Sequence, residues 1–332
     1  MMLSGDCRSD SLGHCSKYGS YTIIEERLNK VIDVQLVQSS EVPNSSWCEL
    51  ERLKRSIRPF SDNDMSVDVL VTDRNRQVAK WVREQLGPQG TRHFYDVWHC
   101  GKGNILIQSG CEDLVLWRQS IVNHLWTAAS TPDANPHLME AKWKSLVNHA
   151  QDIHKHGTQG FPSCLHPPLV GQDRNKQWLV PGSGAAVKLE QVACQPMFVK
   201  DVRQLSPQHQ THSVEAFHSL ILKFAPKHTG FSYLGMYTKL LLAALHYNSN
   251  GNRDMARTKA GVDRYAARYP RFKKGGWSVQ PVKDKLTYGK SPVTAPVPPL
   301  LLPAGSSPER EPHLAAAAVL RLPISNQPSP RA

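Results

Sequence analysis

The sequence predicts an α/β fold built on a mixed five-stranded sheet. Five segments have the length and composition of β-strands, at residues 1–6, Tyr18–Glu25, Val31–Val37, Val67–Thr72 and His93–Val97. Polar residues separate the second segment from the third, which predicts a hairpin and an antiparallel start to the sheet. A helical segment lies between the fourth and the fifth, and a strand–helix–strand unit places its two strands parallel.

Two amphipathic helices provide the connections. In residues 46–60 the apolar side chains recur every three or four positions, as they do in 78–86, where Gly87-Pro88 ends the helix. The element order is therefore βββαβαβ, with three antiparallel strands followed by two parallel crossovers. This is the ribonuclease-H-like arrangement, and we expect residues 1–98 to form the first part of such a core.

The pattern changes between residues 99 and 205. Helical segments are predicted there at Glu112–Ala129, Leu138–His154 and Gly184–Val192, joined by loops rich in Pro, Gly and His. We interpret this region as a mainly helical insertion. Two apolar helices, at 209–224 and 234–247, then complete the core within residues 206–250 and should pack on the sheet.

Residues 251–290 form a basic and aromatic extension. Between Arg264 and Lys290 there are eight Lys or Arg residues and one acid, interleaved with aromatic rings. Such a segment can follow a phosphate backbone and stack on bases, although a charged run can also be a solvated face. The candidate nucleic-acid-binding residues are Arg264, Arg268, Arg271, Lys273 and Lys274. Residues 291–332 are rich in Pro and contain no aromatic residue, which predicts a disordered tail.

Composition narrows the class of protein. The formal net charge of +12 favours a polyanionic partner, although excess charge can also serve solubility alone. The seven cysteines are odd in number, scattered and never arranged as CxxC, which argues against a disulfide framework. Neither a long apolar run nor a signal peptide is evident, so we expect a soluble intracellular protein without a membrane partner.

Three carboxylates stand where such a core could hold metal ions. Asp73 follows an apolar strand, Asp6 ends the first strand, and Glu215 lies on the helix after the insertion. Two neighbouring cations need clustered carboxylates, because one oxygen is activated while another is stabilised. Asp10, Asp96 and His99 are further candidates, Asp96 and His99 from the end of the fifth strand. The alternative is that these acids cap turns or are solvated.

A second group of side chains has the composition of a zinc site. His149, His154, His156, Cys164 and His166 lie within 18 positions (166 − 149 + 1). Their spacing is irregular, whereas zinc ligands usually recur at two to five residues. Ordinary surface histidines are therefore the alternative to zinc, for which His154, His156, Cys164 and His166 are the candidate ligands.

Several runs resemble the DDE-type transposase-derived proteins of animal genomes: GDCRSDSLGHCSKYGSYT, LVTDRNRQVAKWVRE, HFYDVWHCGKG and LSPQHQTHSVEAFHSLILKFAPK. The resemblance covers roughly residues 4–289. It implies a ribonuclease-H-like transposase core, Mg²⁺ or Mn²⁺ as cofactor, and DNA strand cleavage and transfer in the nucleus. Position by position it implies Asp6, Asp73 and Glu215 as the metal-binding triad, with Asp10 as the rival for the first acid. DNA is the implied partner, self-association is compatible with it, and no small-molecule substrate is implied.

Departures from the family pattern support a second hypothesis. Cys7 and Leu12 replace the expected Gly and Pro, and Asn75 replaces the His expected after Asp-Arg. The amino-terminal DNA-binding region typical of such transposases does not precede the first strand. The alternative is therefore a catalytically inactive, transposon-derived nuclear protein that binds DNA or chromatin.

Overall fold

The computed structural model describes residues 1–11, 16–41, 45–102, 112–171, 177–271 and 275–286. A mixed five-stranded sheet lies at its centre, in the order β3-β2-β1-β4-β5. Its strands are β1 (Met2–Ser9), β2 (Tyr18–Glu25), β3 (Lys30–Gln38), β4 (Val69–Thr72) and β5 (Arg92–Tyr95). The first three pair antiparallel, whereas β4 is parallel to both β1 and β5. The predicted α/β class, the hairpin and the parallel pairing of the last two strands are confirmed.

The register of β1 and β4 places two of the predicted acids side by side. Met2 is opposite Val69, and the parallel pairing continues in step to Gly5 and Thr72. The next residue on each chain is an acid, Asp6 on β1 and Asp73 directly after β4. Asp6 therefore lies within β1, which continues to Ser9, and not at the end of the strand as the sequence predicts.

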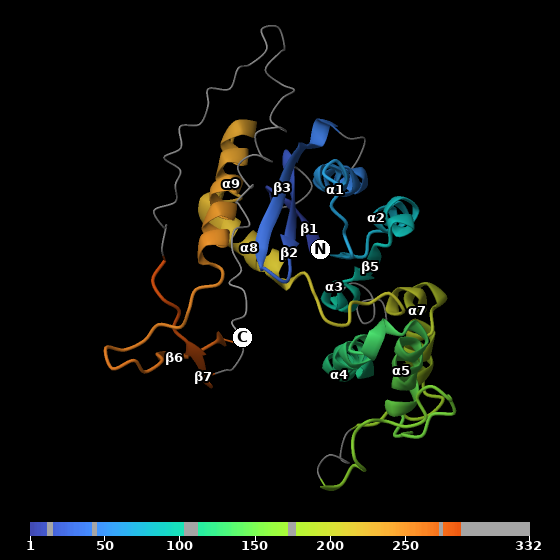
Figure 1. The fold of residues 1–332 in the computed structure, drawn as a ribbon. Coiled ribbons are helices and arrows are strands. Elements are labelled where there is room, and N and C mark those ends of the chain that lie inside the picture. The colour runs from blue at the N-terminus through green and yellow to red at the C-terminus, as the bar shows by residue number, and fades with distance from the viewer. Residues whose placement is uncertain (12–15, 42–44, 103–111, 172–176, 272–274, 287–332) are drawn as a thin grey trace, which may run out of the picture.

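Helices cover both faces of the sheet (Figure 1). On one side α1 (Ser45–Ser61) and α2 (Arg76–Trp81) pack apolar side chains, among them Leu53 and Val78, against Leu3 and Leu70. The chain leaves α2 through the π-helical turn η2 (Val82–Leu86) and the 3₁₀ turn η3 (Gly87–Gln89). Gly90 then has a φ of +93°, a conformation that favours glycine, and the chain enters β5.

On the opposite face lie α8 (His212–Phe224) and α9 (Tyr233–Asn250). Phe217 and Ile221 of α8 are fully buried against Ile24 and Val34 of the sheet, in a cluster that also includes Leu240 of α9. The predicted packing of these two helices on the sheet is confirmed. Burial of this apolar stripe is the main force that holds α8, and with it Glu215, against the sheet.

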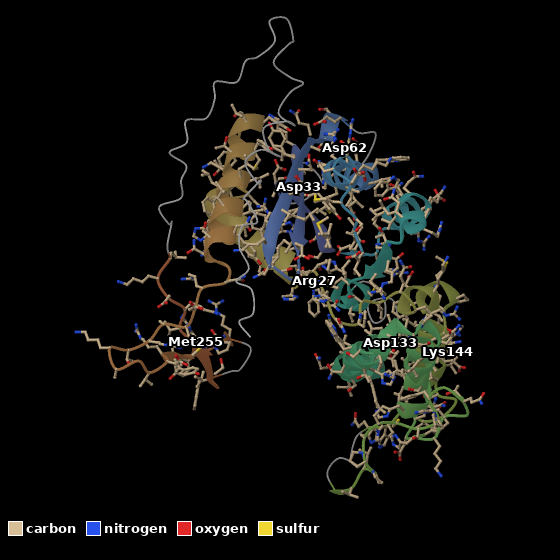
Figure 2. The ribbon with its side chains drawn as sticks, viewed as in Figure 1. Arg27, Asp33, Asp62, Asp133, Lys144 and Met255 are labelled. Carbon is tan, nitrogen blue, oxygen red and sulfur yellow. The ribbon has the colours of Figure 1, made fainter. Side chains whose placement is uncertain are left out.

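Between β5 and α8 the chain forms a helical lobe, marked by Lys144 in Figure 2. Its helices are α3 (Val97–Lys102), α4 (Glu112–Ala129), α5 (Pro136–His149), α6 (Gly184–Ala193) and α7 (Pro196–Val202). Leu205 then forms a parallel bridge with Tyr95, so the chain returns to the edge of the sheet at β5. Two single-turn 3₁₀ helices, η1 (Ser39–Glu41) and η4 (Pro132–Ala134), complete the described elements outside the carboxyl-terminal region.

Two further boundaries differ from the sequence-based prediction. The strand β5 ends at Tyr95 and not at Val97, because Asp96 caps the unpredicted helix α3. The helix α5 ends at His149 and not at His154. The chain turns there, and Asp152 has a φ of +60°, which an α-helix cannot contain.

The basic extension contains secondary structure that the sequence did not indicate. Strands β6 (Tyr265–Arg268) and β7 (Ser278–Pro281) form an antiparallel pair, in the region marked by Met255 in Figure 2. The predicted disordered tail, residues 291–332, lies outside the described residues. Among the described helices none is long and apolar enough to cross a membrane.

Candidate metal centre

Three side chains from separate elements meet beside the carboxyl-terminal end of β4, in the middle of the strand order. Asp6 of β1, Asp73 after β4 and His99 of α3 each offer a ligand atom that lies within 4.8 Å of the other two. The sequence predicted all three as site residues. It placed His99 at the end of the fifth strand, whereas the residue lies in the first turn of α3.

Asp6 is buried, with 8% of its surface exposed. Its Oδ1 accepts a hydrogen bond from the backbone N–H of Cys7 at 2.6 Å, and its Oδ2 lies 3.6 Å from Nδ1 of His218. Burial raises the pKa of Asp6 to about 8, and the neighbouring charge of Asp73 adds to the shift, while His99 opposes it. Near neutral pH, Asp6 therefore ionises only when more positive charge is supplied.

Asp73 provides one bonded oxygen and one that has no partner. Its Oδ2 lies 2.8 Å from Nδ1 of His99. Its Oδ1 is buried and has no hydrogen-bond partner among the described residues. Because an unpaired buried carboxylate oxygen is costly, this atom is the part of the site that most requires a ligand.

His99 supplies positive charge between two acids. Its hydrogen bond to Asp73 raises the pKa of His99 to about 9, and the charges of Asp73, Asp96 and Asp6 act in the same direction against burial. Its Nε2 lies 3.2 Å from Oε1 of Glu215. The imidazolium of His99 therefore connects Asp73 to Glu215.

Among the described residues, His99 provides the contact that links Glu215 to the other acids. It stands in the first turn of α8, and 46% of its side chain is exposed. Asp10 lies elsewhere: its backbone N–H donates to Tyr18, and its Oδ1 accepts from the hydroxyl of Ser16. Of the two candidates for the first acid, the structure places Asp6 and not Asp10 beside Asp73.

A single buried acid, Asp96, positions the helices that carry His99 and Glu215. Its Oδ1 accepts from the backbone N–H of His99 at 2.9 Å and so caps α3. Its Oδ2 accepts from both the N–H and the hydroxyl of Thr211, at 2.7 and 2.9 Å, directly before α8. The spacing of Asp96 and His99 is thus explained by helix capping.

Two residues near the metal centre were not predicted. Glu49 of α1 accepts a hydrogen bond from the Asn75 side chain at 2.7 Å, and burial raises the pKa of Glu49. His218 follows Glu215 by three positions, so both lie on one face of α8, and this spacing could have indicated it. Nothing in the sequence near Glu49 signals its role, because only the packing of α1 brings it here.

An open pocket of about 560 Å³ adjoins the acids. It is lined by Glu49, Asp73, Arg74, Asn75, Arg76, Gln77 and His99. Arg74 forms an ion pair with Asp201 and lies over the ring of Phe198. Asn75, which replaces the expected His, caps α2 by accepting hydrogen bonds from the next turn. The pocket therefore combines acidic groups with basic groups at its rim.

The donor set fits a divalent cation. Two carboxylates with an unpaired buried oxygen suit Mg²⁺ or Mn²⁺, and an imidazole is more compatible with Mn²⁺ than with Mg²⁺. Additional positive charge would also oppose the burial and the Asp73 charge that raise the pKa of Asp6. The residues present thus fit a divalent cation, which Asp6 and Asp73 would hold.

The structure brings together most of the second predicted metal cluster. His154, Cys164 and His166 gather with His149 in the helical lobe, each ligand atom within 4.8 Å of the others. His156 is not in that group, and its Nε2 lies 3.2 Å from the sulfur of Cys164.

The predicted DNA-contacting residues are described only in part. Arg264, Arg268 and Arg271 are exposed, and exposed aromatic rings, Tyr265 and Tyr269, lie beside them in the sequence. Lys273 and Lys274 lie outside the described residues.

The pKa of Asp6 predicts a pH-dependent stability. Because its folded pKa of about 8 exceeds the ordinary aspartate pKa of 3.8, the folded state retains a proton that the unfolded chain has released between these values. In metal-free buffer, wild type should therefore lose stability relative to Asp6→Asn as pH rises from 4 to 8. The difference in free energy of unfolding should change by at least about 1.4 kcal/mol, the value of one pKa unit. Urea denaturation at several pH values measures it.

Asp62→Asn is the matched control for this titration, because Asp62 is an exposed acid on the protein surface. It reports how the loss of one exposed acid changes the free energy of unfolding at each pH. A flat difference for Asp6→Asn would show that Asp6 ionises normally.

No protein-family model matches this chain, and no curated protein is significantly similar to it. The contacts around Asp6, Asp73 and His99 are therefore the observations from which a function can be inferred.

Proposed function

We propose that the chain is a ribonuclease-H-like, DDE-type transposase-like protein that cleaves and transfers DNA strands by metal-dependent phosphoryl transfer. One observation carries the proposal: two acids that directly follow the paired residues Gly5 and Thr72 of neighbouring parallel strands converge, with a buried oxygen of Asp73 left unpaired among the described residues. The strand order, with three antiparallel strands and two parallel ones, supports the same assignment.

Asp6 and Asp73 would hold the first cation, and Glu215 would complete the triad. When bound, Mg²⁺ or Mn²⁺ would activate water or a DNA 3′-hydroxyl and stabilise the leaving oxygen. His99 holds Asp73 in place through Nδ1 and retains Glu215 through Nε2. His218 lies close to Oδ2 of Asp6 and 3.3 Å from the hydroxyl of Thr22, and so restricts the orientation of that carboxylate.

The proposed DNA contact uses the basic extension. Arg264 directly precedes β6, and Arg268 is its last residue. Both are exposed, as is the ring of Tyr265. A net charge of +12 favours association with a polyanion, and nuclear localisation would follow from a DNA substrate.

A catalytically silent DNA- or chromatin-binding protein is the second candidate. The observation that favours it is the half-exposed Glu215, whose contact is with His99 and not with Asp6 or Asp73. If this arrangement persists when metal and DNA are present, only two of the three acids can act on a cation.

A nicking and strand-transfer assay in Mg²⁺ or Mn²⁺ distinguishes the two candidates. Wild type should cleave DNA, and Asp73→Asn should reduce the rate by on the order of 100-fold or more, because it removes a metal-binding charge. Asp62→Asn is the control and should retain the wild-type rate. Absence of cleavage by wild type, or equal rates for Asp73→Asn, would leave the silent binding protein as the function.

DNA binding by the extension predicts a change in salt dependence. Replacing both Arg264 and Arg268 by Ala should weaken binding to any duplex and reduce the slope of log K against log salt by about 2, roughly one per phosphate contact. The double variant Arg58→Ala, Arg83→Ala removes the same charge from exposed positions of α1 and η2. Equal slopes for the two double variants would show that only net charge matters.

A further inference from the structure

We propose that His149, His154, Cys164 and His166 form a structural zinc site in the helical lobe, independent of the activity proposed above. His149 ends α5, and the other three lie in the loop that follows. One ligand atom from each residue lies within 4.8 Å of the corresponding atoms of the other three. The loop folds back on the helix and so brings together residues that are irregularly spaced in the sequence.

The hydrogen bonds of His154 and His166 leave one ring nitrogen of each without a partner among the described residues. His154 uses Nε2 to contact Oδ1 of Asp152 at 3.0 Å, while its Nδ1 is buried without a hydrogen-bond partner. His166 uses Nδ1 to contact the carbonyl of Pro167 at 2.8 Å, while its Nε2 is buried and likewise unpaired. Each ring thus has one nitrogen engaged with an acceptor and the other free to bind a metal.

The remaining pair has the separation of two ligands on one zinc ion. Nδ1 of His149 lies 3.4 Å from the sulfur of Cys164. Zn–S and Zn–N bonds of about 2.3 and 2.0 Å at a tetrahedral angle separate the two atoms by roughly 3.5 Å. A cation between them therefore requires little movement of either side chain.

The surroundings are those of a structural metal site. The contact of Asp152 with His154 matches the carboxylate–histidine–metal arrangement that fixes the ring tautomer and orientation. Nε2 of His156, 3.2 Å from the sulfur of Cys164, can donate a hydrogen bond to a thiolate. Trp178 lies edge-on to both His149 and His154 and covers the cluster on one side.

The loop that carries three of the four residues is long and has little regular structure. Residues 150–183 connect α5 to α6, and in their described parts the regular pairing is limited to one bridge, between Lys155 and Ser163. A connection of this length in a compact lobe usually needs a further constraint. A metal ion held by one helical residue and three loop residues would supply it, as structural zinc does in small domains.

The donor set selects zinc among the common divalent cations. One thiolate and three imidazoles make four ligands of intermediate softness, which suit tetrahedral Zn²⁺ and are poor ligands for Mg²⁺. Because all four positions would be filled by protein atoms, the site would stabilise structure and have no open position for substrate.

Metal analysis of the full-length chain, expressed with zinc and freed of any His tag, tests the proposal. We expect about one zinc per chain, and loss of most of it in His166→Gln and Cys164→Ser. The matched control is His137→Gln, an exposed histidine at the other end of α5, which should keep its zinc. With Co²⁺ in place of zinc, the visible spectrum should be tetrahedral, with a sulfur-to-cobalt band that Cys164→Ser removes.

Further measurements separate this site from the carboxylate centre and from simple misfolding. Asp73→Asn should retain the zinc, whereas metal bound at the carboxylate centre would be lost from that variant. In wild type, removal of zinc by a chelator should accelerate tryptic cleavage at the exposed Lys155 several-fold. The proposal would be overturned by less than about a tenth of an equivalent of zinc in wild type, by full zinc content in both ligand variants, or by cleavage at Lys155 that chelation does not change.

Discussion

The close approach of the buried Asp6 to the partly buried Asp73 is the constraint on which the rest of the site depends. Parallel pairing of β1 and β4 in one register places the two acids next to each other, beside the carboxyl-terminal end of β4. Burial and the charge of Asp73 raise the pKa of Asp6, and the hydrogen bond to Asp73 raises the pKa of His99, so both shifts favour positive charge at this point. His99 supplies part of this charge, and a divalent cation would supply more.

The surrounding elements hold His99 and Glu215 close to this pair of acids. Asp96 caps α3 and also holds Thr211 before α8, so one buried side chain sets the positions of both His99 and Glu215. The apolar stripe of α8 fixes the same helix against the opposite face of the sheet. The helical lobe is inserted between β5 and α8, and the proposed zinc site would stabilise it locally. The residues that stabilise the fold around α8 thus also position the carboxylates. The two candidate metal sites have no residue in common.

Much of the sheet could be predicted from the sequence, because its strands have apolar runs of the correct length and clear turns between them. The bounds of β2 agree with the prediction, and Asp73 was predicted because it directly follows an apolar strand. Helix α3 was missed because it is short and begins directly after β5, so its capping acid, Asp96, was assigned to the end of the strand. Glu49 was missed for a related reason, since only the packing of α1 brings it to the pocket. The candidate zinc ligands were chosen by residue type, and their irregular spacing did not indicate that His149 lies beside His154, Cys164 and His166 or that His156 lies outside that group.

Mn²⁺ binding, measured by isothermal titration calorimetry on zinc-loaded protein at neutral pH, tests the central claim most directly. Binding between Asp6 and Asp73 should be weakened at least about tenfold by Asp6→Asn and by Asp73→Asn, because each removes a ligand charge. It should be unchanged in Asp10→Asn, whose side chain lies away from the pair. Equal Mn²⁺ affinity in wild type, Asp6→Asn and Asp73→Asn, or a loss confined to Asp10→Asn, would contradict the account.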